Sequence, residues 1–128
     1  MENRELMYLA ENAKQKSYSP YSKFKVGAAL LTKDGKIYVG ANIENSSYPL
    51  TVCAERVAFF KAISEGEKEF EKIAISGSSD DFCFPCGACR QVMSEFCGKD
   101  FVIILENGKE IKSFTLVELL PYSFKLDK

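Results

Sequence analysis

Residues 86–106, CGACRQVMSEFCGKDFVIILE, carry the pattern that decides the fold class. The first part, residues 86–97, is predicted to be a buried helix that Gly98 closes. The second part, residues 101–106, is almost entirely apolar and predicts a central strand. A helix that leads directly into a buried strand is typical of α/β domains.

The rest of the chain continues this alternation, with two hairpins inserted. We expect further helices over residues 3–16, 52–65 (ending at Gly66) and 115–121, and strands over residues 25–32, 37–41, 71–77 and 109–114. Asp34-Gly35 and Asn107-Gly108 are hairpin signals. The pattern predicts a three-layer α/β/α sandwich with a mixed sheet of about five strands, in a single domain over residues 1–128.

The composition excludes several classes of protein. A chain of 128 residues with 46% hydrophobic and 27% charged residues is typical of one globular domain. Its 17 basic and 18 acidic residues form no run of like charge, so we expect no nucleic-acid partner. No stretch has the length of a membrane span or the pattern of a signal peptide. We therefore expect a cytoplasmic protein whose thiols stay reduced.

Five cysteines and no histidine make the thiols the most informative residues of the chain. Because five is an odd number and the expected compartment is reducing, a disulfide framework is the weakest interpretation. Three others remain open. They are an iron–sulfur cluster with Cys97 as fourth ligand, a structural four-cysteine zinc site that includes Cys83, and a catalytic zinc site.

The spacing of three cysteines favours a zinc site with an open position. Cys86 and Cys89 are three residues apart at a predicted helix start, so their side chains share one face. Cys53 lies in the first turn of the predicted helix 52–65, for which Thr51 is a plausible N-cap. Two helix N-termini that meet would favour thiolates at the meeting point. Three thiolates leave the fourth tetrahedral position free, as in catalytic sites.

The two residues that follow this cysteine motif have a possible chemical role. Glu55 is a poor ligand, but it could take a proton from a water at the open position and pass it to a substrate. Arg56 could donate to a thiolate and offset the negative charge of a three-thiolate zinc site. The alternative for Glu55 is a solvated carboxylate favoured by the helix dipole.

The segments Cys53-Ala54-Glu55 and Pro85-Cys86-Gly87-Ala88-Cys89 resemble the zinc-dependent nucleoside and nucleobase deaminases. The pattern of those proteins is [HC]-x-E followed by P-C-x-x-C. Longer segments are similar to the small cytidine deaminases, in the same order: YSPYSKFKVGAALLT (18–32), ANIENSSYPLTVCAERVAFFKA (41–62) and FPCGACRQVMSEF (84–96). The resemblance covers roughly residues 5–125.

This resemblance implies a role for each matching residue. It implies one zinc ion per chain, held by Cys53, Cys86 and Cys89, with Glu55 as proton shuttle and Arg56 bonded to the thiolates. It also implies that Asn42 and Glu44 hold the ribose, that Phe24 packs against the pyrimidine, and that the backbone around Ala54 reads the carbonyl edge. Cys83 and Cys97 would be free thiols.

The small enzymes of this family are homotetramers with shared active sites, which implies the same assembly here. Tyr48 and Phe124 would then lie at or near a site shared between subunits, and core packing is the alternative for both aromatic residues.

The implied reaction is hydrolytic deamination of free cytidine and 2′-deoxycytidine to the uridines plus ammonia, a step of pyrimidine salvage. A free nucleoside is favoured over a polynucleotide because the chain has no basic stripe. One alternative is a deaminase of a related nucleoside such as blasticidin S, although the loop from Asn42 to Tyr48 points to a ribose. The other is a non-enzymatic four-cysteine zinc module that binds a partner protein.

Overall fold

The computed structural model describes residues 1–127, and Lys128, the last residue of the expected domain, lies outside this part. Five strands form one sheet in the order β2-β1-β3-β4-β5. Their bounds are Val26–Thr32 (β1), Ile37–Ala41 (β2), Phe70–Gly77 (β3), Val102–Glu106 (β4) and Ile111–Thr115 (β5). Only β3 and β4 pair in parallel, whereas β1 is antiparallel to β2 and β3, and β4 to β5. The prediction of a mixed sheet is therefore confirmed.

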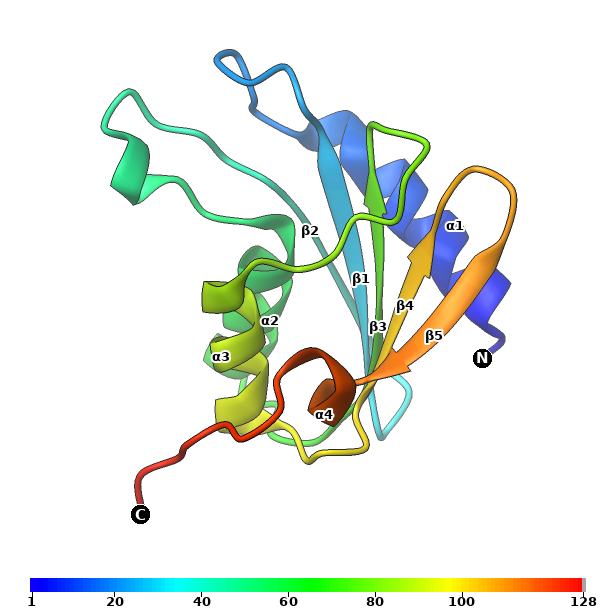
Figure 1. Ribbon diagram of the computed structural model, residues 1–128, viewed down its shortest axis with the longest axis vertical. Helices are drawn as coiled ribbons and strands as arrows, with labels where there is room; N and C mark the ends of the chain where they lie inside the picture. The colour runs from blue at the N-terminus through cyan, green and yellow to red at the C-terminus, as the bar shows by residue number, and fades with distance from the viewer. Residues whose placement is uncertain (128) are drawn as a thin grey trace.

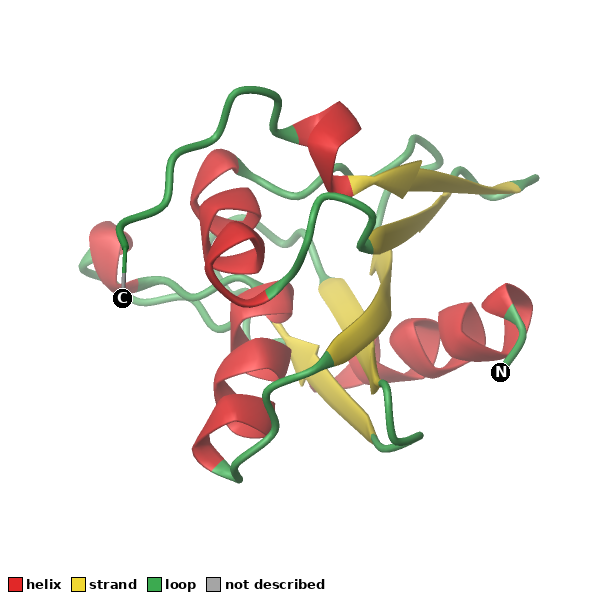
Figure 2. Cartoon of the chain, turned by 90° about the horizontal axis from the view of Figure 1, so that it is seen from below, coloured by secondary structure: helices red, strands yellow, loops and turns green. Residues whose placement is uncertain are grey.

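Helices cover both faces of the sheet, as Figures 1 and 2 show. Helix α1 (Asn3–Ala13) lies on one face, whereas α2 (Ala54–Ser64) and α3 (Gly87–Phe96) lie on the other. The short helix α4 (Leu116–Leu119) follows β5 and packs beside α3. The three-layer α/β/α architecture is confirmed. Within residues 1–127, none of these helices is long and apolar enough to cross a membrane.

Alternating residues of the central strands separate two apolar cores. Side chains from one set of positions, Ala28, Leu30, Ile73, Ile75, Ile103 and Leu105, pack with α2 and α3. The intervening positions, Ala29, Leu31, Ala74 and Ile104, pack with Leu6, Met7 and Ala10 of α1. Because successive side chains of a strand point to opposite faces, strands buried on both faces are apolar throughout. This explains the almost continuous apolar run that ends in β4.

Two of the expected turns depend on glycine conformations. Gly35 and Gly108 have φ angles of +91° and +85°, in the β1–β2 and β4–β5 hairpins respectively. Left-handed backbone of this kind carries little steric cost for glycine, which has no Cβ.

All four helices are shorter than predicted, and the structure explains two of the changed boundaries. The first helix ends at Ala13, and Lys14–Lys16 form a 3₁₀ turn instead of continuing it. The second begins at Ala54, because Val52 is held extended by two backbone hydrogen bonds of 2.9 Å with Ile43. Thr51 is therefore not the N-cap, and its hydroxyl instead accepts the N–H of Asn45 at 3.2 Å.

Candidate active site

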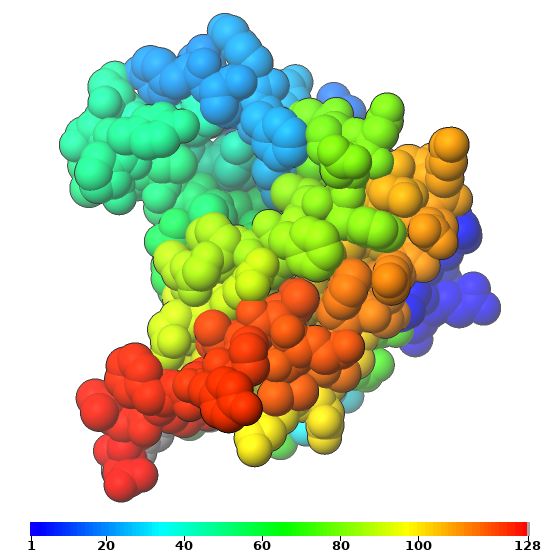
Figure 3. All heavy atoms as spheres, in the orientation of Figure 1, coloured from blue at the N-terminus to red at the C-terminus, as the bar shows by residue number. Residues whose placement is uncertain are grey.

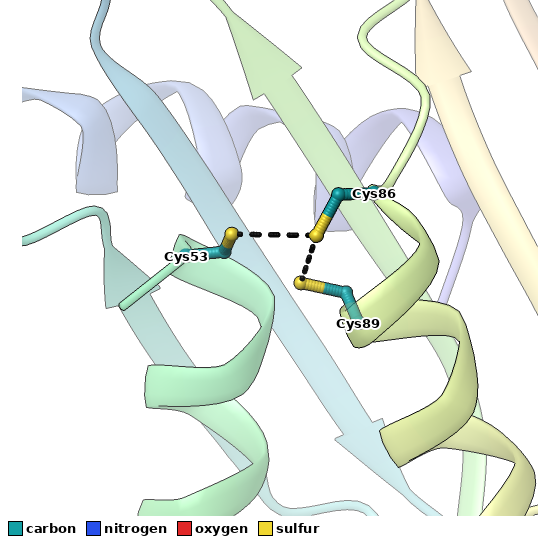
Figure 4. A group of neighbouring side chains, drawn as sticks. All are labelled: Cys53, Cys86 and Cys89. Carbon is teal, nitrogen blue, oxygen red and sulfur yellow. Dashed lines mark hydrogen bonds between the residues drawn. The ribbon is translucent and has the colours of Figure 1, made fainter. Parts of the chain in front are cut away.

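Three cysteines from two helix starts lie together at one end of α2 and α3 (Figure 4). Cys53 is the N-cap of α2, Cys86 is the N-cap of α3, and Cys89 lies in the first turn of α3. The Sγ atoms of Cys53 and Cys86 are 3.6 Å apart, and those of Cys86 and Cys89 are 3.3 Å apart. All three sulfur atoms lie within 4.8 Å of one another. The expected meeting of two cysteine-bearing helix N-termini is present.

A glycine in β2 lets α2 approach the sheet closely enough to place Cys53. A Cβ atom at Gly40 would lie 2.4 Å from the carbonyl oxygen of Ala54 and 2.8 Å from the backbone nitrogen of Ala58. No side chain fits at that position without moving the helix. The first turn of α2 therefore contacts β2 directly. Cys53 comes immediately before this turn, so the same contact places it in the thiol cluster.

The sulfur atoms fit a zinc ion. Two thiolates on a tetrahedral zinc lie about 3.8 Å apart when the zinc–sulfur bonds are about 2.3 Å long. The measured separations of 3.3 and 3.6 Å are close to this value. In residues 1–127 no fourth cysteine or carboxylate belongs to the group. A zinc ion held here would keep one position open, as catalytic zinc sites do.

The thiols of Cys53 and Cys89 differ strongly in pKa. Hydrogen bonds from Cys89, Arg56 and Cys86 lower the pKa of the Cys53 thiol to about 5. The same bond to Cys53, together with burial, raises the pKa of the Cys89 thiol far above its ordinary value. Without metal, the cluster thus carries its negative charge on Cys53. Metal binding must displace the remaining thiol protons, because the thiolate is the ligand form.

The other two cysteines are outside the cluster. Burial raises the pKa of Cys83 to about 11 and that of Cys97 to about 12, so both are protonated thiols at neutral pH. Cys97 follows α3 at its far end, roughly 16 Å along the helix axis from Cys86. An iron–sulfur cluster with Cys97 as fourth ligand is therefore wrong. Cys83 does not join the group of three either, which removes the basis for a four-cysteine zinc module.

Glu55 is buried beside the thiols. Its side chain is 4% exposed, so the alternative of a solvated first-turn carboxylate is wrong. Burial raises the pKa of this carboxyl to about 7, and the negative charge on Cys53 adds to the effect. A carboxyl group whose pKa lies near neutrality can both accept and release a proton at physiological pH.

The guanidinium group of Arg56 contacts the thiol cluster. Its Nη2 atom donates to Cys53 Sγ at 3.4 Å, and bonding to Cys53 and Cys89 raises the pKa of the guanidinium further. Its buried Nε–H has no hydrogen-bond partner within the described part of the chain. Part of the charge of a three-thiolate site is thus offset by one permanent cation.

Asn42 and Glu44 join the loop after β2 to the loop before β1. Asn42 Oδ1 accepts the N–H of Val26 at 3.0 Å, and its Nδ2 donates to the carbonyl of Phe24 at 2.8 Å. Glu44 Oε1 accepts the N–H groups of Tyr21 and Ser22 at 3.0 and 3.1 Å. These bonds hold both side chains in fixed orientations.

Two serines complete this network and were missed in the sequence. The Ser22 hydroxyl donates to Glu44 and lowers the pKa of that carboxyl, while the Ser17 hydroxyl donates to Asn42. Serines in a Ser/Pro-rich loop are too common to mark a site. Only the pairing of the two loops in space reveals them.

Phe24 lies near the thiol cluster, because it packs with Cys83 over Gly77. A Cβ atom at Gly77 would be 3.1 Å from the Phe24 ring and 2.9 Å from Cys83 Sγ, so both side chains pack over this glycine. The negative charges of Glu55 and Cys53 act on the pKa of Cys83. The half-buried Phe24 ring therefore belongs to the same end of the sheet as the thiols. Ala54, the first residue of α2, is fully buried there.

Tyr48 and Phe124 are exposed in the single chain. Tyr48 is 61% exposed and Phe124 is 68% exposed, so packing in the core of the same chain is wrong for both. Phe124 lies in the C-terminal segment, which projects from the body of the molecule in Figure 3. The carbonyl of Phe124 accepts a hydrogen bond from Gln91 Nε2 at 3.3 Å.

Comparison with known proteins identifies the family. Residues 1–105 match the family described as "Cytidine and deoxycytidylate deaminase zinc-binding region". The chain is 48% identical to a cytidine deaminase of Sporosarcina psychrophila, over 97% of this chain and 92% of that protein. It is 50% identical to a cytidine deaminase of Halalkalibacterium halodurans, over 97% of this chain and 95% of that one.

A solved structure shows the same fold. The crystal structure of a cytidine deaminase from Burkholderia pseudomallei superimposes with a TM-score of 0.92 at 44% identity, covering 97% of this chain and 100% of that one. The sequence match, the shared fold and the three-thiol cluster all agree. The chain belongs to the zinc-binding cytidine and deoxycytidylate deaminase family.

Proposed function

We propose that this protein catalyses the hydrolytic deamination of free cytidine and 2′-deoxycytidine, which consumes water and releases uridine or 2′-deoxyuridine and ammonia. One observation carries the proposal: a thiol cluster one ligand short of a closed zinc site lies beside the buried carboxyl of Glu55. A structural zinc site requires neither an open ligand position nor a neighbouring carboxyl group.

The proposed zinc ligands are Cys53, Cys86 and Cys89. When bound, zinc would supply a Lewis acid that brings the pKa of a coordinated water toward neutrality. Glu55 accepts the proton of the attacking water and passes it to N3 of the cytosine as C4 is attacked. It then carries the second proton to the departing amine, so water supplies the new carbonyl oxygen and both transferred protons. A carboxyl pKa of about 7 suits both directions of transfer.

The remaining residues hold the substrate in this proposal. Asn42 and Glu44 retain unused hydrogen-bonding capacity for ribose hydroxyls, because a carboxylate accepts about four bonds and an amide nitrogen donates two. Phe24 packs against the pyrimidine, and the backbone at Ala54 contacts the carbonyl edge. The negative charge of Glu44 disfavours a 3′-phosphate, which supports a free nucleoside over a polynucleotide.

We further infer a homotetramer working in the cytoplasm. Exposed apolar side chains support the assembly: Leu50 and Phe60 line a hollow of about 510 Å³, and Tyr122, Phe124 and Leu126 are exposed in the C-terminal segment. In the assembly, Tyr48 and Phe124 lie at or near a shared site. Five free cysteines agree with a reducing compartment. Sedimentation of the zinc-loaded protein at four times the chain mass is the expected result.

The decisive experiment is the ultraviolet spectrum of zinc-loaded protein mixed with cytidine. We expect loss of the cytosine band with release of ammonia. The variant Glu55→Gln should keep its zinc and fold but lose roughly 10³-fold or more in kcat, since each positioned proton transfer contributes about 10²–10⁴-fold. Glu71→Gln, an exposed carboxylate at the start of β3, is the matched control and should react at the wild-type rate.

Two results would refute the proposal. An unchanged spectrum with zinc fully bound would indicate another amine substrate, such as blasticidin S, or a non-catalytic metal. Full activity of Glu55→Gln would remove that residue from the mechanism.

A further inference from the structure

Arg90 makes two short hydrogen bonds that join separate parts of the chain. Its Nε atom donates to the carbonyl of Pro85 at 2.7 Å, and its Nη1 atom donates to the carbonyl of Leu119, also at 2.7 Å. Within residues 1–127 neither carbonyl accepts another hydrogen bond. One arginine on α3 therefore connects the loop before Cys86 with the last turn of α4.

The first of these bonds acts directly before a cysteine of the cluster. Pro85 and Cys86 share a peptide bond, so the direction of the Pro85 carbonyl fixes the backbone from which the Cys86 side chain leaves. Cys86 is the one cysteine of the cluster that is exposed to solvent, and it sits at the end of a loop without regular structure over residues 78–86. Packing alone therefore constrains it less than Cys89, which is 1% exposed.

Other contacts hold the same loop at a different point. The rings of Phe82, Phe84 and Phe114 contact one another with centroids 5.2 to 6.3 Å apart, which fastens the middle of the loop to β5. These contacts are apolar and leave the Pro85 carbonyl without a donor. The charge-assisted bond from Arg90 fills that need, and such bonds are about twice as strong as neutral ones.

We propose that Arg90 is a positioning residue, which fixes the Pro85–Cys86 peptide and so orients Cys86 toward the metal. Its role differs from that of Arg56, which bonds to a sulfur atom directly. Through Leu119, Arg90 also links this geometry to the C-terminal segment. The inference rests on the proposed zinc site at Cys53, Cys86 and Cys89.

The test compares Arg90→Met with Arg4→Met in the full-length, zinc-loaded protein. Methionine keeps an apolar stem but cannot donate, and Arg4 on α1 is a matched control far from the cluster in sequence and on the other face of the sheet. The main readout is the rate at which zinc passes to a coloured chelator. We expect at least a tenfold faster release from Arg90→Met, since outer-shell partners of metal ligands contribute about 10–100-fold in affinity.

A second readout separates positioning from general stabilisation. The melting temperature of each protein is measured with saturating zinc and after complete removal of zinc. A positioning role shrinks the difference between the two values, because the variant binds metal more weakly. A merely structural role lowers both values equally and leaves zinc release unchanged. That second outcome would overturn the proposal.

If Arg90→Met does not fold, Arg90→Lys provides a second test of the same inference. Lysine keeps the charge but lacks the planar fork that reaches two carbonyl groups in different directions. We expect faster zinc release than in the wild type, and release at the wild-type rate would overturn the inference. Failure of the proposed function looks different: the wild type itself would hold no zinc or would not deaminate cytidine.

Discussion

The helices on the two faces of the sheet present opposite ends at the same level of the sheet, and the charged groups found at those ends differ accordingly. At Gly27 in β1, an added Cβ would meet Ala10 and Lys14, so α1 ends at this level of the sheet. Gly27 pairs with Ala41, next to Gly40, where α2 begins on the opposite face. Helix N-termini favour anions and C-termini favour cations. In agreement with this, the thiol cluster with its charged Cys53 lies on the α2/α3 face, and a lysine follows the end of α1.

The two faces also differ in the surroundings of their acidic groups. On the α2/α3 face, Glu55 lies alone among thiols with a pKa near neutrality. On the α1 face, Glu11 and Glu106 form a carboxyl pair that raises the pKa of Glu11, with Ser76 donating to Glu106 at 2.5 Å. The first arrangement leaves a proton available to a substrate. The second shares a proton between two half-buried groups of the protein itself, whereas the apolar residues of the α1 face form a packed core.

The largest effect should follow the loss of one thiol from the cluster. We expect Cys53→Ser to lose most of its zinc and to fall to background deaminase activity, because two thiolates hold the metal far less tightly than three. Cys83→Ser, a change of the same kind beside the cluster, should retain zinc and activity. Metal analysis by mass spectrometry together with ammonia release checks both. Loss of zinc in Cys83→Ser would mean that the site has four ligands.

A core truncation on the α1 face should reduce stability without changing the chemistry. Leu6 is fully buried against the sheet, so Leu6→Ala should lower the free energy of unfolding by about 2–5 kcal/mol. The rate constant per folded molecule should stay within about twofold. Urea unfolding and kinetics on the same sample provide the measurement. Tyr8→Ala, an exposed residue of the same helix, should change stability by less than about 0.5 kcal/mol.

If Leu6→Ala slowed the folded enzyme as strongly as it destabilised it, the separation between a packing face and a reacting face would be wrong.

The smallest effect concerns the carboxyl pair and depends on pH. The raised pKa of Glu11 means that the folded chain holds its proton more tightly than the unfolded chain. Stability is therefore lost as pH rises above about 4.5, the ordinary value, and through the folded pKa. Glu106→Gln should remove this loss and stabilise the protein at pH 7.5 by less than about 1 kcal/mol, with no gain at pH 4.5.

Thermal unfolding at the two pH values checks this prediction, with the exposed Glu110→Gln as control. A gain at pH 4.5 that equals or exceeds the gain at pH 7.5 would show that Glu106 does not raise the pKa of its neighbour.

Much of the fold follows from local sequence signals. The apolar run of β4, the two hairpin glycines and the helix end at Gly66, with a φ of +98°, all depend on residues within one element. The start of α2 does not. Thr51 has the chemistry of an N-cap, but pairing of Val52 with Ile43 keeps the backbone extended for two more residues. That partner lies nine residues away, where local propensity gives no information.

The candidate site likewise combines residues that local spacing predicts with residues that only tertiary packing brings together. Cysteine spacing indicates that Cys86 and Cys89 share a face, and both belong to the cluster. The burial of Glu55 and the bonds of Arg90 depend on how α2, α3 and α4 pack, and no spacing in the sequence encodes them. Serine hydroxyls such as that of Ser22 carry no distinctive signal, although the structure places it on Glu44.

The separation of Cys53 from Cys86 by 33 positions has a consequence for biosynthesis. At about 5–20 residues per second, a ribosome delivers Cys53 roughly two to seven seconds before Cys86. The low pKa of Cys53 depends first on Cys89, which is synthesised later still. In the nascent chain we expect Cys53 to remain a protonated, slowly oxidised thiol. The full lowering of its pKa arises only when Cys86 and Cys89 are also in place, so we expect this thiol to be oxidised more slowly in the unfinished chain than in the folded protein without metal.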